Sequence, residues 1–197
     1  MPHKIINNPQ RKPAIPIRGN RINSRTKGNK NERVVAELLT KWTNKPFSRT
    51  PSSGGLQWKS SNSKGDVVCT KEGHFFPFCV EVKAHKEIDF SQLLNPKLKN
   101  VKVLEFWEQC SRDAKRANKV PLLFMRYNGM PKDFFFVALE LNFWKSLFPN
   151  LAIALTINTK FEYSNKKEKI HLILLQSTEF INLPYKEIKL LTKKFLK

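Results

Sequence analysis

Acidic residues are scarce in this sequence, which has 16 Asp and Glu against 36 Lys and Arg and a formal net charge of +20. A chain with this charge repels itself unless a polyanion lies nearby, and nucleic acid is the commonest such partner. The sequence also lacks a run of roughly 18 apolar residues, the length that a membrane-spanning helix needs. The charge therefore favours nucleic acid over a membrane as the partner.

Cysteine is rare as well. The three cysteines are odd in number and have neither the close pairing of a zinc site nor the density of a disulfide scaffold. The four histidines lack the spacing that places two imidazoles on one metal ion. We therefore expect an intracellular protein, cytoplasmic or associated with the nucleoid, without a zinc site. The abundance of Lys and Asn is compatible with a phage, a virus or an AT-rich host.

The first 31 residues contain eight Lys and Arg side chains and no acid, with Pro and Asn interspersed and no apolar period. This composition predicts a flexible basic N-terminal arm over residues 1–27. The arm would wrap a phosphate backbone. An organelle-targeting segment is the alternative, although the prolines argue against the amphipathic helix that a transit peptide needs.

The length of 197 residues suits one catalytic domain with additions. Apolar spacing predicts a helix over residues 31–43, followed by a Ser/Thr/Gly-rich loop over 48–63. Two strands, 66–70 and 75–84, would form a β-hairpin through a turn at 71–73. This first half of the chain therefore combines a helix with a hairpin.

The pattern continues with a helix over 101–118, a buried strand over 121–127, an apolar run over 133–139 and a short helix over 141–148. The run includes Phe134, Phe135 and Phe136, which we interpret as a buried strand and not as a platform for stacking bases. The alternation of helices and strands predicts an α/β sandwich around a mixed sheet.

Beyond residue 140 we expect a C-terminal extension, 141–197, packed on a core that spans 28–140. Apolar runs over 151–157 and 170–175 predict a second hairpin. Residues 185–197 predict a basic amphipathic helix with Ile188, Leu191 and Phe195 on one side. This helix would serve for packing, for a second DNA contact or as a dimer face.

The few acids are placed in an informative way. Hydrolysis of a phosphodiester calls for carboxylates that converge on a hard divalent cation. Asp66 opens the first strand of the predicted hairpin, and Glu81 and Lys83 lie near the end of the second. The two-residue period of a strand points Glu81 and Lys83 to the same side. Taken alone, this pair is equally typical of a solvated strand face.

Together, Gly65-Asp66 and the following Glu81-Val82-Lys83 resemble the PD-(D/E)XK nuclease superfamily, with Gly65 in the place of the motif's proline. The resemblance implies a restriction-endonuclease-like core, a central mixed β-sheet flanked by helices. It also implies that Asp66, Glu81 and the backbone carbonyl of Val82 bind Mg²⁺, for which Mn²⁺ would substitute. Lys83 would orient the attacking water or stabilise the developing charge.

Within that superfamily the chain looks most like the archaeal and phage-type Holliday junction resolvases. Their Lys-Gly, three residues, Glu-Arg pattern is matched from Lys27 to Arg33, and residues 49–55 look like their Arg and Ser-Gly loop. The resemblance covers roughly residues 27–127 and implies DNA recombination and repair. Paired symmetric nicks in a four-way junction suit a homodimer with two active sites.

Helix geometry separates two acids on the first helix. Glu32 lies about 90° from the centre of the apolar stripe and Glu37 about 130° from it on the other flank. Glu32 is therefore the better placed to reach inward, and we expect it to be the third acidic ligand, directly or through water. Glu37 is predicted to be solvated.

Other candidates are less specific. Gln109 on the second helix occupies a place where many enzymes of this superfamily carry Gln or Lys, but a polar flank residue would look the same. Trp58 would stack on an unpaired base or anchor its loop. The residues that we expect to contact DNA are Lys27, Lys30, Arg33, Arg49, Ser52, Ser53 and Trp58.

The leading hypothesis is thus a Mg²⁺-dependent, structure-selective endodeoxyribonuclease that resolves Holliday junctions as a homodimer. A sequence-specific restriction or homing nuclease, or a repair nuclease, keeps the same site on another substrate. A non-enzymatic basic DNA-binding protein explains the charge equally well. It does not explain the placement of Glu32, Asp66, Glu81 and Lys83.

Overall fold

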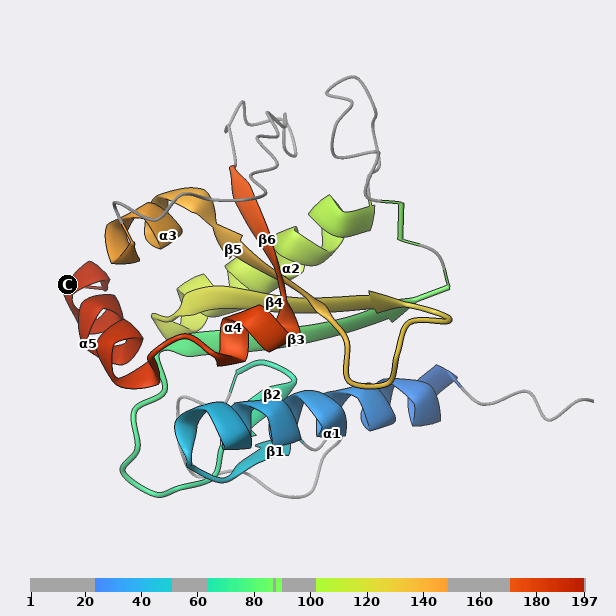
Figure 1. Cartoon of the computed structure of the whole chain (residues 1–197), viewed down its shortest axis with the longest axis horizontal. Helices are drawn as coiled ribbons and strands as arrows, with labels where there is room; N and C mark the ends of the chain where they lie inside the picture. Colours follow the sequence, from blue (N-terminus) through green and yellow to red (C-terminus); the bar gives the residue numbers. More distant parts are fainter. Residues whose placement is uncertain (1–23, 51–63, 87, 90–101, 149–170, 197) are drawn as a thin grey trace, which may run out of the picture.

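The computed structural model describes residues 24–50, 64–86, 88–89, 102–148 and 171–196 (Figure 1). These residues form one mixed six-stranded sheet in the order β1-β2-β3-β4-β5-β6. Every neighbouring pair is antiparallel except β3 and β4, which run parallel. The predicted α/β architecture, a central mixed sheet flanked by helices, is confirmed. None of the described helices is long and apolar enough to cross a membrane.

The strands are β1 (Phe47–Arg49), β2 (Val67–Cys69), β3 (Phe78–His85), β4 (Val120–Tyr127), β5 (Phe136–Glu140) and β6 (Leu172–Gln176). The helices are α1 (Ser24–Thr43), α2 (Lys102–Ala117), α3 (Leu141–Leu147), α4 (Ser177–Ile181) and α5 (Tyr185–Phe195). The end of α1 is followed by Asn44 and the end of α2 by Asn118, both with positive φ, the left-handed conformation that terminates many helices.

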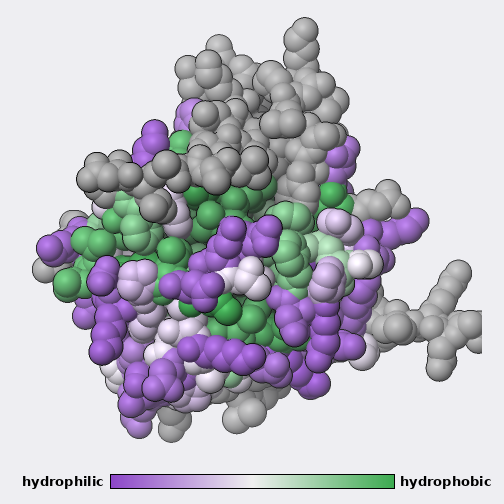
Figure 2. All heavy atoms as spheres, in the orientation of Figure 1, coloured by the Kyte–Doolittle hydropathy of each residue, from purple (hydrophilic) through white to green (hydrophobic). Residues whose placement is uncertain are grey.

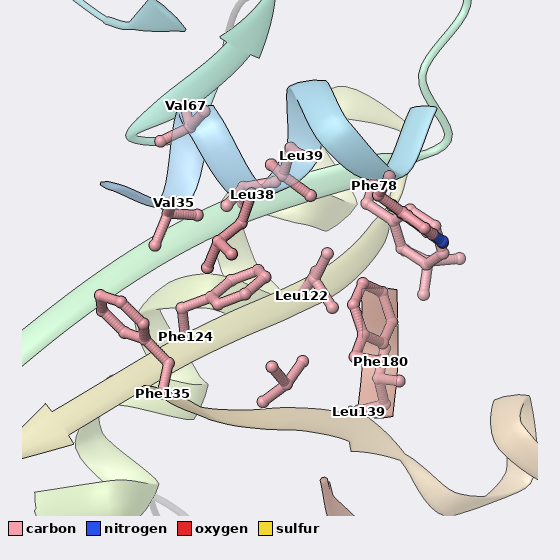
Figure 3. Close-up of a cluster of buried hydrophobic side chains, with 14 of the residues drawn as sticks. Val35, Leu38, Leu39, Val67, Phe78, Leu122, Phe124, Phe135, Leu139 and Phe180 are labelled. Atoms are coloured by element: carbon pink, nitrogen blue, oxygen red, sulfur yellow. The ribbon is translucent and has the colours of Figure 1, made fainter. Parts of the chain in front are cut away.

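The sheet is buried on both faces. On β4, Leu122 and Phe124 point into the larger core, while Leu123 and Met125 point into the smaller one, as the two-residue period of a strand requires. The larger core also receives residues of α1, α3, α4 and α5, and the smaller one is closed by α2. Figure 3 shows the larger core, where side chains of α1 meet those of the sheet and Phe180 of α4.

The helix α1 is amphipathic. Val35 and Leu39 are fully buried, whereas Arg33, Glu37 and Lys41 are exposed. Burial of each such aliphatic side chain contributes about 1.5 to 3 kcal/mol. In Figure 2 the face along which α1 runs is largely hydrophilic. The helix therefore holds one side against the sheet and leaves the other to solvent.

Several predicted elements are confirmed with shifted bounds. The helices expected over 101–118 and 141–148 and the strand expected over 121–127 are α2, α3 and β4. The two strands of the predicted hairpin pair antiparallel as β2 and β3, but residues 70–77 separate them, so the connection is longer than the expected turn. The C-terminal helix is present as α5.

Other expectations were wrong. Helix α1 begins at Ser24, seven residues before its predicted start at residue 31. Its beginning was missed because none of the residues 26–30 is buried, so they show no apolar pattern. The predicted loop over 48–63 begins with residues of a strand, β1, that pairs with β2. Of the three phenylalanines from 134 to 136, only Phe135 is buried, and strand β5 starts at Phe136. The short helix α4 was not expected.

The predicted second hairpin falls partly outside the described residues, which exclude 151–157. Its other half is β6, which pairs antiparallel with β5, with Glu140 opposite Leu172. The sheet therefore continues across residue 140, where we placed the end of the core. Helix α5 packs on α3, and Phe195 contacts Phe143 with 5.1 Å between the ring centroids.

Candidate metal centre

Asp66 is held between two strands by backbone contacts. Its N–H donates to the carbonyl of Val80 at 2.7 Å, and its own carbonyl accepts from the N–H of Thr50 at 2.8 Å. The Thr50 hydroxyl donates to the carbonyl of Gly65 at 2.7 Å. The Asp66 side chain is thereby placed at the end of β2, beside the middle of β3.

The local backbone conformation explains why a glycine, Gly65, precedes Asp66. Its φ is +105°, and a Cβ at this position would lie 2.6 Å from the carbonyl oxygen of Val80. Proline has φ fixed near −65° and could not adopt this conformation. The replacement of the motif's proline by glycine therefore matches the local backbone.

Glu81 and Lys83 meet as the strand period predicts. Lys83 Nζ lies 2.6 Å from Glu81 Oε1, and the Glu81 side chain is only 3% exposed. The neighbours Val80 and Val82 point into the larger core on the other face. A solvated surface pair is thus excluded, because the carboxylate is buried.

Gln109 reaches the same carboxylate from α2. Its Nε2 donates to Glu81 Oε1 at 2.7 Å. Glu81 therefore accepts two side-chain donors on one oxygen, from Lys83 and from Gln109. Gln109 is thus hydrogen-bonded to a residue of the candidate site, and a catalytic role for it stays a prediction.

Asp66 and Glu81 share one electrostatic environment. The N–H of Val82 donates to Asp66 Oδ2 at 2.8 Å. Burial, followed by the charge of Glu81, raises the pKa of Asp66 to about 6, against the lowering effects of the Val82 N–H and the Lys83 ammonium. A carboxyl group whose ionisation is disfavoured by burial and by a neighbouring carboxylate is typical of a site that accepts a cation.

The donor set fits a hard divalent cation. Within the described part of the chain, Asp66 Oδ1 and Glu81 Oε2 accept no hydrogen bond, so one oxygen of each carboxylate is available. Oxygen ligands of this kind are what Mg²⁺ binds in proteins. The described residues do not, however, include a group of three His, Cys, Asp or Glu side chains close enough together to hold a metal ion.

Glu32, the predicted third acid, is engaged by Arg49 and is not grouped with Asp66 and Glu81. Its Oε2 accepts from Arg49 Nε at 3.1 Å, and Arg49 Nη2 also donates to the Asn29 side chain at 3.0 Å. The charge of Glu32 is still near enough to raise the pKa of Asp66, as the least of five contributions. Glu37 is exposed, as expected. That Glu32 binds the cation, directly or through water, stays a prediction.

The predicted DNA-binding residues are spread over three places. Lys27, Lys30 and Arg33 are exposed on α1, and the ammonium of Lys27 donates to the side chain of Asn128. Arg49 is ion-paired with Glu32. Ser52, Ser53 and Trp58 lie outside the described residues.

Two positioning residues were not predicted. Thr50 fixes the backbone at Gly65 and Asp66, and Asn29 orients Arg49. Both depend on the pairing of β1 with β2 and on its approach to α1. A three-residue strand inside a Ser/Thr/Gly-rich segment carries no periodic signal from which this could be predicted.

Comparison with known proteins points to one family. The family model described as "Phage putative PDDEXK endonuclease" matches residues 23–190. Protein D14 of Escherichia phage T5 is 32% identical over 107 residues, which are 53% of this chain and 65% of that protein. The chain thus matches less than two thirds of the length of this curated relative. No solved structure matches the chain significantly.

Proposed function

The chain belongs to the phage PDDEXK endonuclease family, whose model it matches over residues 23–190, and on this premise we propose that it is a Mg²⁺-dependent endodeoxyribonuclease that cuts branched DNA. The observation that carries the proposal is the convergence of Asp66, Glu81, Lys83 and Gln109 at the junction of β2, β3 and α2. The net charge of +20 suits a polyanionic substrate.

Asp66 and Glu81, with the carbonyl of Val82, would hold Mg²⁺, and Mn²⁺ would substitute for it. A divalent cation, when bound, neutralises phosphate charge and helps water to ionise. Lys83 Nζ lies 2.6 Å from Glu81 Oε1, so its ammonium would be near a phosphate bound at the cation, where it would orient water or stabilise charge.

The remaining residues would prepare the site. Gln109 holds Glu81 through its 2.7 Å hydrogen bond and so fixes which oxygen is offered to the cation. Glu32, paired with Arg49, would contact the cation through water. Lys27, Lys30 and Arg33 on the exposed side of α1 would bind the phosphates that flank the cut. Ser52, Ser53 and Trp58 would complete this contact.

We further propose that the substrate is a four-way junction and that the protein cuts it as a homodimer, in recombination or repair. The support is the resemblance of residues 27–33 and 49–55 to junction resolvases. A dimer with two-fold symmetry would place one acidic site on each of two strands that need paired nicks.

The test compares a labelled four-way junction with a linear duplex of the same sequence, each incubated with the protein and Mg²⁺. We expect paired nicks at symmetric positions in the junction and slower cutting of the duplex. Equal cutting of both would contradict junction selectivity. Cutting at one duplex sequence alone would favour a restriction or homing nuclease. Binding of both without any cutting would favour a non-enzymatic DNA-binding protein.

A further inference from the structure

Four lysines lie at the end of β1 and β2 that faces away from the acidic site. Arg49 and Val67 pair at the end next to Asp66, and Phe47 and Cys69 pair at the other end. Lys45 precedes β1 and Lys71 follows β2 at this second end. Lys189 and Lys193 come from α5. We call Lys45, Lys71, Lys189 and Lys193 the lysine cluster.

Hydrogen bonds hold the three contributing segments together. The N–H of Thr70 donates to the carbonyl of Pro46 at 2.9 Å, which joins the segments of Lys71 and Lys45. His74 Nε2 lies 2.9 Å from the Tyr185 hydroxyl, which joins the β2–β3 loop to the first residue of α5. The lysine cluster is therefore built on ordered backbone and not on a single mobile side chain.

The charge of the lysine cluster is concentrated and unbalanced. Burial lowers the pKa of His74, and the charges of all four lysines lower it further. Burial also lowers the pKa of Lys189, as do the charges of Lys193 and Lys45. In the described part of the chain, none of the four lysines forms an ion pair with an acid.

The acids nearest in sequence do not offset this charge. At 100° per residue along α5, Lys189 and Lys193 lie about 40° and 80° from Tyr185, while Glu187 lies about 200° from it. Glu187 therefore points away from the lysine cluster. Glu72, next to Lys71, is exposed and makes no ion pair with a described residue.

Aromatic rings line the same place. Lys193 Nζ lies 5.4 Å from the centroid of the Phe75 ring, and Tyr185 contacts Trp42 with 5.0 Å between the ring centroids. Contact with a ring holds an ammonium near the surface of the protein. A cluster of ammonium groups on a rigid base is suited to a run of phosphates.

We propose that the lysine cluster binds the phosphate backbone of duplex DNA at a distance from the cut, so that one arm of the substrate lies along α1. This inference rests on the proposed function for its choice of DNA as the ligand. From Glu32 to Thr43, helix α1 rises about 16 Å at 1.5 Å per residue. At about 3.4 Å per base pair this is about five base pairs of duplex.

An anionic lipid surface is a second partner that lysines can bind, but the position of the lysine cluster favours DNA. The same helix, α1, carries Glu32 near one end and is followed by the Lys45 turn at the other. A duplex arm that enters the acidic site is therefore within reach of the lysine cluster. Binding to a vesicle would not depend on how the lysine cluster is aligned with the acidic site.

The test measures DNA binding by Asp66→Asn protein without divalent cation, so that cutting plays no part. Two double variants remove the lysine cluster from different elements: Lys189→Gln with Lys193→Gln, and Lys45→Gln with Lys71→Gln. The matched control is Lys115→Gln with Lys145→Gln, which takes the same charge from α2 and α3. The probes are labelled four-way junctions in which one arm has about 4 or about 16 base pairs.

We expect the protein to bind the probe with the longer arm more tightly than the probe with the shorter arm. Each double variant should lose this gain in affinity, with its Kd for the longer arm raised about tenfold. The slope of log K against log salt should become shallower by about 2, since each lost phosphate contact contributes about 0.9. The control should keep the gain.

If neither double variant differs from the control on the longer arm, the inference is overturned. It is also overturned if the variants lose binding to vesicles of phosphatidylserine and keep their binding to DNA. Failure of the proposed nuclease function would look different. The unmodified protein would not cut DNA with Mg²⁺, while the dependence of binding on arm length would remain.

Discussion

The ionised side chain of Asp66 lowers the stability of the folded protein, whereas the proposed function requires it to be ionised. Burial raises the pKa of Asp66 to about 6, so the folded protein binds this proton more tightly than the unfolded chain does. The free energy of unfolding therefore falls as pH rises from about 4 to about 6, and this loss persists above pH 6. A carboxylate that destabilises the protein without a cation is suited to bind one.

The substitution Asp66→Asn should accordingly stabilise the cation-free protein at pH 7.5 by about 1 to 3 kcal/mol, and have little effect at pH 4. The asparagine carbonyl can still accept from the N–H of Val82. The measurement is urea unfolding in EDTA at the two pH values, with Asp113→Asn as the control. A destabilised Asp66→Asn protein at pH 7.5 would show that Asp66 is not under electrostatic strain.

Gln109 is predicted to be a positioning residue for Glu81. Loss of a hydrogen bond to a charged group costs about 1.5 to 3 kcal/mol, so Gln109→Ala should lower kcat by tenfold or more. The Mg²⁺ concentration for half-maximal activity should rise, because Glu81 loses a donor that fixes it. KM for DNA should change little. Glu105→Gln, an exposed substitution on α2, is the control. A rise in KM with unchanged kcat would assign Gln109 to DNA binding instead.

At the scale of elements, the approach of β2 to β3 depends on Gly65. A Cβ there would lie 2.6 Å from the Val80 carbonyl oxygen in a backbone with φ of +105°. Gly65→Ala should therefore destabilise the fold by roughly 2 to 4 kcal/mol and displace Asp66. Gly73→Ala is the control, since Gly73 also has positive φ but a Cβ would meet nothing within 4 Å. Thermal unfolding of both variants measures this. Equal losses of stability would show that backbone strain alone, and not the close approach, constrains Gly65.

The sequence predicts the elements that have a strong period and misses those that do not. Helix α2 has an apolar stripe at helical spacing and strand β4 is a continuous apolar run, which is why their bounds are close to those expected. Strand β1 has three residues, and the first turns of α1 bury no apolar face, so neither has a periodic signal. Their positions are set by long-range contacts, such as Arg49 with Glu32.

The residues of the site were likewise predictable only where a local sequence pattern exists. Asp66, Glu81 and Lys83 follow from a motif and from the geometry of one strand, and the meeting of Glu81 with Lys83 is confirmed. The contact of Gln109 with Glu81 joins residues 28 positions apart, and only the packing of α2 on the sheet determines it. Likewise, sequence alone did not reveal that Arg49 would engage Glu32, because that pair joins β1 to α1.

For the whole molecule, charge and fold act together. The net charge of +20 attracts DNA without choosing a site on it. The sheet holds Asp66 and Glu81 where a bound cation would offset their charge. The Glu81 side chain is only 3% exposed there. Under the proposed function, DNA binding would use much of the surface, whereas the chemistry would be confined to the end of β2 and the middle of β3.

Metal-dependent DNA cleavage is proposed to take place at Asp66 and Glu81. The measurement that tests it most directly is the initial rate of cutting of a labelled four-way junction at saturating Mg²⁺, by the unmodified protein and by Asp66→Asn. We expect the rate to fall by at least about 100-fold, with DNA binding retained and with Glu37→Gln as active as the unmodified protein. Equal rates for Asp66→Asn and the unmodified protein would contradict it.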